Sequence, residues 1–251
     1  MKKLSLLLLL TISTILFSCE NLQTLIPAEL ATGGLSNEDI IRGLKEALKI
    51  GTDTSVNKLN KVNGYLSDQA VKILLPQEAQ VITQHLSVLP GGQLLIDEVQ
   101  RKINRAAEDA AVEAKPIFIN AITSITIADG LTILNGANNA ATNYLKQKTY
   151  ASLQSAFQPK ISSSLNKEII GGVSAESAYN GLVSKYNLAV TTANLTGGNY
   201  PKVTSNSLSE YTTQRALDGL FLKVAEEEAD IRQKASARVT DILKEVFGRN
   251  G

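Results

Sequence analysis

The sequence predicts an all-α fold, a single multi-helix bundle of about eight helices over residues 36–248. Apolar residues recur every three to four positions through most of this stretch, which is the spacing of the buried face of a helix. Strand-like alternation of apolar and polar residues is scarce. Helix N-terminal signals, in which a serine precedes an acidic residue by three positions, stand before two of the apolar segments.

The first helix is predicted to begin after Ser36, which forms an acidic variant of the capping box with Asp39. Gly51 predicts an interruption or a kink in this helix. A second helix is expected over residues 76–89, with a proline in its first turn, and the Pro-Gly-Gly sequence at 90–92 should end it.

A long helix is predicted over residues 94–114. A break or kink should follow, because Pro116 pushes the residue before it out of the helical region. After a turn at 135–136, another helix is expected over residues 140–157, and Pro159 should kink that helix rather than end it.

The second half of the chain predicts three helices and one long loop. The first of these helices covers residues 174–186 and is capped by its opening serine. Residues 188–206 are then predicted to form the longest loop, and we expect mobility there because the segment offers no convergent charged groups. Ser207, with an acidic residue three positions on, opens a helix to about Arg232, and the last helix is expected over residues 237–247.

The length and composition are those of a protein with one continuous core. The chain lies near the upper size at which a single core remains possible. It has no Trp and only 5 Phe, so the core must be mainly aliphatic. Its one cysteine excludes a disulfide framework. The formal net charge of +1 argues against a nucleic-acid partner, which would need a clustered basic surface.

The N-terminal segment has the three parts of a secretory signal. Lys2 and Lys3 form a positive start, residues 6–17 are mainly apolar, and the small Ser18 precedes Cys19. The apolar stretch is too short for a membrane-spanning helix, which needs about 20 residues.

These features predict a bacterial lipoprotein signal peptide over residues 1–18, with lipidation of Cys19 by acyl chains such as palmitate. Residues 19–35 would then tether the helical domain to a membrane. Glu20 is not the aspartate that commonly retains such proteins at the inner membrane, which favours the outer membrane and a periplasm-facing domain. The alternative is soluble periplasmic export, with Cys19 left as a free thiol.

No sequence feature indicates a metal or cofactor site, and we predict no cofactor. His85 is the only histidine, so a zinc or haem site has no ligand set. No nucleophile-elbow sequence accompanies this histidine. The glycine pairs lack the Lys-Ser/Thr of a phosphate loop. The absence of a catalytic motif argues against an enzyme without excluding one.

One group of candidate polar residues lies on the helix over residues 94–114. Arg101, Arg105 and Glu108 are predicted opposite its apolar stripe. They form either a solvated face or, together with Asn104, the lining of a cleft.

A second candidate is Glu228, which falls inside the apolar stripe of the helix that Ser207 opens. A carboxylate there is costly unless a cation or hydrogen-bond donor pairs with it. Arg232, one turn on, is the local partner, and Arg101, Arg105 and Lys115 are distant ones. Glu228 is therefore either a structural ion pair that fixes how helices cross or a carboxylate that faces a pocket.

The same helix is expected to contact neighbours on two sides. Leu208, Tyr211 and Leu222 lie off its main apolar stripe. This predicts a central place in the bundle. The main stripe consists of Leu217, Leu220, Phe221, Val224 and Ile231.

Several separated segments point to a known group of proteins. They are residues 43–48, 104–108, 114–118, 133–136, 140–142 and 217–232. Together they resemble domain-of-unknown-function family 4197 over residues 36–248. The resemblance implies an exported, helical bacterial protein of a kind that often carries a lipoprotein signal, and it implies no catalytic residue.

Three functional classes remain open from the sequence. One is a module that binds an unknown small ligand or an envelope protein between helices. Another is a hydrolase-like enzyme that uses Glu228 with support from arginine or lysine. The last is a purely structural envelope protein. A pocket lined by Glu228, Arg105 and Asn104 would favour binding or catalysis, whereas ion pairs packed without a cavity would favour a scaffold.

Overall fold

The computed structural model describes residues 35–76, 79–88, 90–169, 172–203 and 207–248. It divides the chain into two units, residues 1–36 and 37–251. Cys19 and the predicted signal peptide lie outside the described residues, as does all but the last residue of the predicted tether. The second unit contains every helix described below.

Within the described residues the chain is all-α, as predicted. There is no named strand, and one isolated β-bridge joins Glu168 to Ser174. The elements are α1 (Asn37–Asn60), α2 (Gln80–Ser87), α3 (Gly92–Ala111), α4 (Ala114–Thr123), α5 (Ile127–Leu134), α6 (Ala140–Leu165), α7 (Ala175–Leu195), α8 (Leu208–Gln233), the 3-10 helix η3 (Ala235–Ala237) and α9 (Asp241–Phe247).

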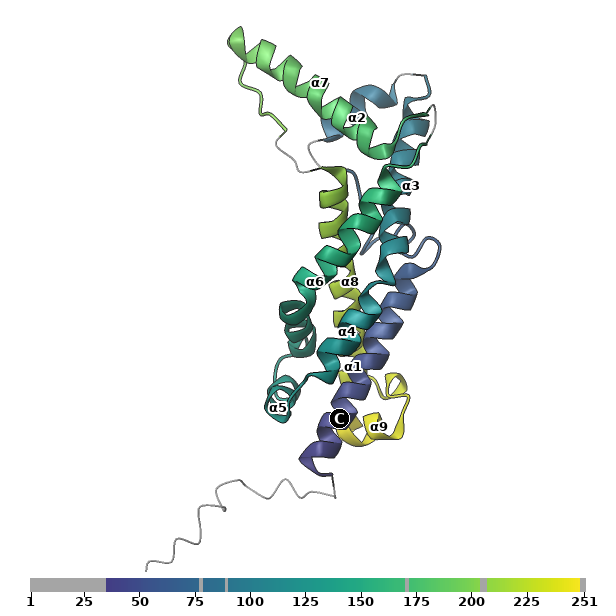
Figure 1. The fold of residues 1–251 in the computed structure, drawn as a ribbon, viewed down its shortest axis with the longest axis vertical. Coiled ribbons are helices and arrows are strands. Elements are labelled where there is room, and N and C mark those ends of the chain that lie inside the picture. Colours follow the sequence, from purple (N-terminus) through teal and green to yellow (C-terminus); the bar gives the residue numbers. More distant parts are fainter. Residues whose placement is uncertain (1–34, 77–78, 89, 170–171, 204–206, 249–251) are drawn as a thin grey trace, which may run out of the picture. The chain divides into compact units, whose positions relative to one another are not determined.

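The core is built where α1, α3 and α6 meet α8, and α4 packs against α1 and α6. Figure 1 shows α1, α4, α6 and α8 running alongside one another. Phe118 of α4 and Phe157 of α6 are fully buried. The Phe118 ring meets Phe221 of α8 edge-on, with 6.0 Å between centroids. Burial of each such side chain contributes about 1.5–3 kcal/mol, so apolar contacts of this kind are a large favourable term in the stability of the unit.

The interruption predicted at Gly51 is wrong, because α1 runs unbroken from Asn37 to Asn60. A Cβ at Gly51 would lie 3.5 Å from Cβ of Glu227 and 3.7 Å from Cδ1 of Ile231. The glycine therefore marks a close approach of α1 to α8 rather than an interruption. Packing against α8 outweighs the low helix propensity of one glycine.

Two proline-based predictions hold with shifted boundaries. The break near Pro116 falls at 112–113, since the proline is accommodated in the first turn of α4. Pro159 does not end α6, which continues to Leu165. The helix predicted over residues 76–89 begins later, because α2 covers only Gln80–Ser87.

The loop predicted over residues 188–206 is wrong in its first half, because α7 continues to Leu195. The returning segment is fastened to the helix by two amide side chains. Asn187 exchanges two hydrogen bonds with the backbone of Val203, and Asn194 does the same with Tyr200. The returning segment therefore packs along the C-terminal part of α7, which the sequence predicts to lie beyond the end of the helix.

The turn between α4 and α5 carries a reciprocal capping box. The Thr126 hydroxyl accepts from the backbone N–H of Asp129, and the Asp129 carboxylate accepts from the backbone N–H of Thr126.

None of the described helices is by itself long and apolar enough to cross a membrane. Only α4 and α5 taken together meet that test, and they are bent by 105° at the break between them.

The C-terminal helix is shorter than predicted. Residues 235–237 form η3, and Thr240 caps α9, which begins at Asp241. Gly248 is the C-cap of α9 and has a right-handed φ of −78°.

We predict that Gly219→Ala lowers the free energy of unfolding by about 1 kcal/mol, although alanine favours helices by a similar amount. A Cβ at Gly219 would lie 3.0 Å from Cε1 of Tyr65 and 3.2 Å from Cβ of Val71. The Tyr65 ring is fully buried, and its hydroxyl donates to the Ala216 carbonyl at 2.8 Å, so it has little room to move. Urea unfolding measures the change.

The matched control is Gly181→Ala in α7, where nothing lies within 4 Å of the new methyl group. It should raise stability by about 0.5–1 kcal/mol through helix propensity alone. An equal gain from both substitutions would contradict the close contact at Gly219.

Candidate functional site

The predicted polar residues do not gather in one cleft. Arg101 forms an exposed ion pair with Glu98 on its own helix. Nζ of Lys115 lies 2.6 Å from a carboxylate oxygen of Asp53 on α1. The remaining candidates form two groups, each around a buried glutamate: Glu228 pairs with Arg232, and Glu108 and the buried Asn104 lie beside the partly exposed Arg105.

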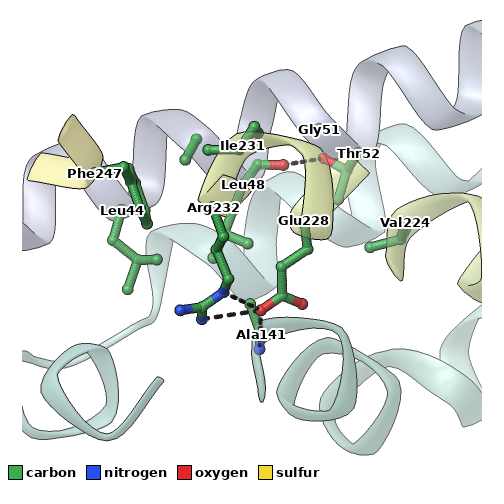
Figure 2. Close-up of a pocket in the computed structure, with 11 residues that line it drawn as sticks. Leu44, Leu48, Gly51, Thr52, Ala141, Val224, Glu228, Ile231, Arg232 and Phe247 are labelled. Carbon is green, nitrogen blue, oxygen red and sulfur yellow. Dashed lines mark hydrogen bonds and ion pairs between the residues drawn. The ribbon is translucent and has the colours of Figure 1, made fainter. Parts of the chain in front are cut away.

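Glu228 is held by four donors. Its Oε1 accepts from the backbone N–H of Ala141 at 3.0 Å and from Nε of Arg232 at 3.0 Å. Its Oε2 accepts from the backbone N–H of Thr142 at 2.8 Å and from the Thr142 hydroxyl at 2.7 Å. Figure 2 shows the ion pair and the contact with Ala141. The partner predicted one turn along the helix, Arg232, is the one that the structure contains.

These contacts place Glu228 at the start of α6. Asn139, the N-cap residue, makes no side-chain capping bond, and the carboxylate from α8 takes over that role. Arg232 meanwhile donates to the carbonyls of Ile133 and Leu134 at the end of α5. Each charge faces the helix end of opposite partial charge, which is the favourable arrangement. The pair therefore fastens the α5–α6 turn to α8.

The cavity beside this pair is too small for a substrate. Its volume is about 20 Å³, enough for about one water molecule, whereas small-molecule sites occupy about 300–1,000 Å³. Both oxygens of Glu228 are already engaged by the protein. The geometry thus supports a structural role for the pair. The cavity is lined by Leu44, Ala47, Leu48, Gly51, Thr52, Ala141, Val224, Glu228, Ile231, Arg232 and Phe247.

The prediction that Glu108 lies on a solvated outer face of α3 is wrong, because Glu108 is only 2% exposed. The segment at 61–76 folds over this side of the helix and covers it. The backbone N–H of Tyr65 donates to Oε1 of Glu108 at 3.3 Å, and Arg105 donates to Oε2 at 3.2 Å. Asn104, fully buried, accepts from the N–H of Ile73 at 2.9 Å and donates to its carbonyl at 2.8 Å. These side chains hold the covering segment in place.

Burial raises the pKa of Tyr65 far above its usual range, and the charge of Glu108 adds to the effect. The phenol therefore remains protonated at any physiological pH. It acts as a fixed donor to the Ala216 carbonyl, which ties the 61–76 segment to α8 as well as to α3.

Glu176 repeats the capping arrangement and was not anticipated. It lies in the first turn of α7, but its oxygens accept from the backbone N–H groups of Leu208 and Ser209, at 3.1 and 2.9 Å, at the start of α8. An acidic residue in a first turn is common for local reasons. Nothing in the sequence distinguishes one that caps a different helix.

A groove of about 300 Å³ lies between residues 70–74 and α8. This volume falls within the range of small-molecule sites. Tyr211, Arg215, Asp218 and Leu222 contribute one wall and recur at helical spacing, so they form one face of α8. The off-stripe positions of Tyr211 and Leu222 indicated a second contact surface on this helix. The sequence of α8 alone does not show that this surface lies against residues 70–74, which are distant along the chain.

The described residues contain no group of three or more His, Cys, Asp or Glu side chains that could hold a metal ion. His85 belongs to α2, but its side chain lies outside what the structure describes.

Comparison with known proteins settles the family. A family model described as "Protein of unknown function (DUF4197)" matches residues 34–248. The chain belongs to the DUF4197 family. This confirms the resemblance seen in its separated segments. No curated protein matches the DUF4197 chain, and no solved structure matches it.

We predict that Glu228→Gln destabilises the DUF4197 chain by about 3–5 kcal/mol, the usual cost of breaking a buried ion pair. The substitution leaves Arg232 charged and largely buried, and it replaces one of the two acceptor oxygens with a donor. Urea unfolding at neutral pH measures the loss.

Glu245→Gln is the control, because this glutamate of α9 is exposed. Its stability change should stay within about 0.5 kcal/mol of zero. An equally small change for Glu228→Gln would contradict the structural role and would return the residue to the list of functional candidates.

We also predict that Asp68→Asn reduces the acid sensitivity of the fold. The hydrogen bond from Lys223 of α8 holds the pKa of the Asp68 carboxyl below its ordinary value. A folded-state pKa below the unfolded one, about 3.9, adds stability above that pH, and the stability is lost as pH falls through the folded pKa. Since Asp68 is 38% exposed, the effect should remain below about 1 kcal/mol.

The measurement is the urea midpoint at about pH 5 and about pH 2.5. Wild type should lose more stability between the two than Asp68→Asn does. Asp97→Asn serves as the control, because Asp97 forms no ion pair with a described lysine or arginine. Identical losses in wild type and Asp68→Asn would refute the contribution of the Asp68–Lys223 pair.

Proposed function

We propose that the DUF4197 chain is a lipid-anchored protein of the bacterial cell envelope whose helical unit binds other molecules rather than transforming them. Residues 1–18 would be removed as a signal peptide, and Cys19 would carry the acyl chains. Residues 19–35 would join this anchor to the helical unit.

The observation that favours binding over catalysis is that the buried carboxylates are occupied by hydrogen-bond donors of the protein. The described residues bury three of them, Glu108, Glu176 and Glu228. Each accepts one or two backbone N–H groups from a segment distant in sequence. A general acid or base must reach a substrate proton directly or through one water, and these groups are occupied in holding the fold. The hydrolase-like alternative therefore has no supporting geometry at Glu228.

The groove between residues 70–74 and α8, called the α8 groove below, gives the binding role direct support. It is of ligand size, open to solvent, and lined by both apolar and charged side chains. Arg215 and Asp218 in it are about half exposed. The surface of α8 thus carries charged groups that can meet another molecule, whereas the buried carboxylates serve the fold.

The anchor is supported by the sequence and by simple energetics. Each buried methylene of an acyl chain contributes about 0.8 kcal/mol, so a single chain binds a membrane weakly, whereas two or three together hold stably. A cysteine at the new N-terminus can carry several such chains. The single cysteine and its position after a short apolar run have a common explanation in this modification.

Mass spectrometry of the protein purified from its host envelope tests both parts. The intact mass should correspond to a chain that begins at Cys19 and carries acyl groups. Under native conditions the same preparation should retain a non-covalently bound small molecule or protein. Cys19→Ser should abolish the acyl mass and release the protein from the detergent-soluble membrane fraction.

Ser18→Ala is the matched control, since it keeps a small residue before the cysteine and should leave lipidation intact. A chain that retains its initiating methionine, or one that stays in the aqueous fraction with a free thiol, would contradict the anchor. A preparation that never retains a partner would favour a purely structural role.

A further inference from the structure

We propose that the α8 groove binds a carboxylate that is attached to an apolar group. The free C-terminal residue of a peptide and a short fatty acid share this chemistry. The inference rests on the proposed function, since it assigns a site and a ligand class to the binding role of the helical unit.

Arg215 is positioned to receive an anion. Its Cζ lies 5.8 Å from the centroid of the Tyr211 ring, so the guanidinium is held against an aromatic face. Its ion pair with Asp218 is a single contact at 3.4 Å, and the side chain remains 51% exposed. A guanidinium has five N–H donors and binds carboxylates best through two parallel hydrogen bonds. The existing contact leaves donors available for that arrangement.

The charge of the groove favours an anion. Lys72 lies on the wall opposite α8, and among the described residues no carboxylate lies within ion-pair distance of it. Two cations therefore face the groove against the single carboxylate of Asp218. An incoming carboxylate would bind Arg215 in place of Asp218 and would lie in the positive field of Lys72.

The apolar part of the ligand also has a counterpart. Leu74 and Leu222 both line the groove and are 58% and 41% exposed. An apolar group that covers them removes their surface from water, which is favourable in proportion to the area buried. Together with the cations, these side chains match a ligand that carries its negative charge next to an apolar group.

The groove is built before any ligand arrives. The Tyr211 hydroxyl donates to the Leu74 carbonyl at 3.1 Å, which joins the two walls. Asn104 holds the neighbouring Ile73 at both its N–H and its carbonyl. Gly219 allows α8 to approach Val71 closely at the floor of the groove. A preformed site loses less conformational entropy on binding.

The experiment is a calorimetric titration of the full-length chain, purified in detergent, with acetyl-Leu-Leu, its C-terminal amide, and hexanoate. We expect the free dipeptide acid, hexanoate or both to bind, and the dipeptide amide to bind at least about tenfold more weakly than its acid, because it lacks the charge. Arg215→Gln should weaken acid binding by about tenfold as well. Asp218→Asn should strengthen it severalfold by removing the competing carboxylate.

Arg42→Gln is the matched control, since Arg42 is another exposed arginine in an ion pair with an aspartate three residues away, outside the groove. It should leave binding unchanged. Leu222→Ser provides a second groove variant, with Leu195→Ser of α7 as its exposed counterpart. Thermal unfolding of each variant shows that a lost signal does not reflect a lost fold.

Tighter binding of the dipeptide than of hexanoate would identify a peptide end as the source of the carboxylate, and the reverse order would identify a fatty acid. Absence of binding by both acids up to about 10 mM would overturn the proposal. Equal binding of dipeptide acid and amide, or an unaffected Arg215→Gln variant, would do the same. The broader binding role would survive such a result if the native preparation still retains a partner, so the two failures are distinguishable.

Discussion

The bundle depends on buried charges that cap the ends of neighbouring helices. A helix terminus leaves backbone groups without partners, and each must find one when it is buried. In this chain a glutamate of α8 supplies acceptors for the start of α6, and a glutamate of α7 does so for the start of α8. Arg232 and Arg238 serve the ends of α5 and α8 in the same way. Removing charges from water is costly, and good geometry at several partners is what offsets that cost.

Buried and exposed charges therefore have different roles in this protein. A carboxylate that is saturated by backbone donors is part of the architecture, even though a charge on an apolar stripe looks reactive in a sequence. Residues 70–74 lie along one face of α8, and Arg215 and Asp218 on that face remain about half exposed. Exposed charge on that face can meet a partner without loss of structure.

The sequence predicts the features that depend on local rules. Helical periodicity predicts the all-α class, and Ser174 and Ser207 both cap the helices that follow them, as expected. The spacing of four residues predicts the pair of Glu228 with Arg232. Each of these needs only one helix and its own neighbours along the chain.

The failures share a different origin. The periodicity of α3 predicts Glu108 on an outer face, because the sequence of α3 cannot show that a distant segment covers it. Gly51 predicts an interruption because the sequence of α1 alone does not show the close approach of α8. The α8 groove was missed for the same reason, since its two walls are about 140 residues apart along the chain, as the 137-residue separation of Tyr211 and Leu74 illustrates.

The position of α1 has a mechanical consequence. The proposed tether joins the unit at the first residue of α1, so any pull between membrane and partner enters the fold there. α1 packs against α3, α4, α5, α8 and α9. Gly43 brings it close enough to α9 that an added Cβ would lie 2.7 Å from Cγ2 of Val246. Tension at this end therefore meets the contact of α1 with α9 early, and complete release of α1 requires its contacts with all five helices to break.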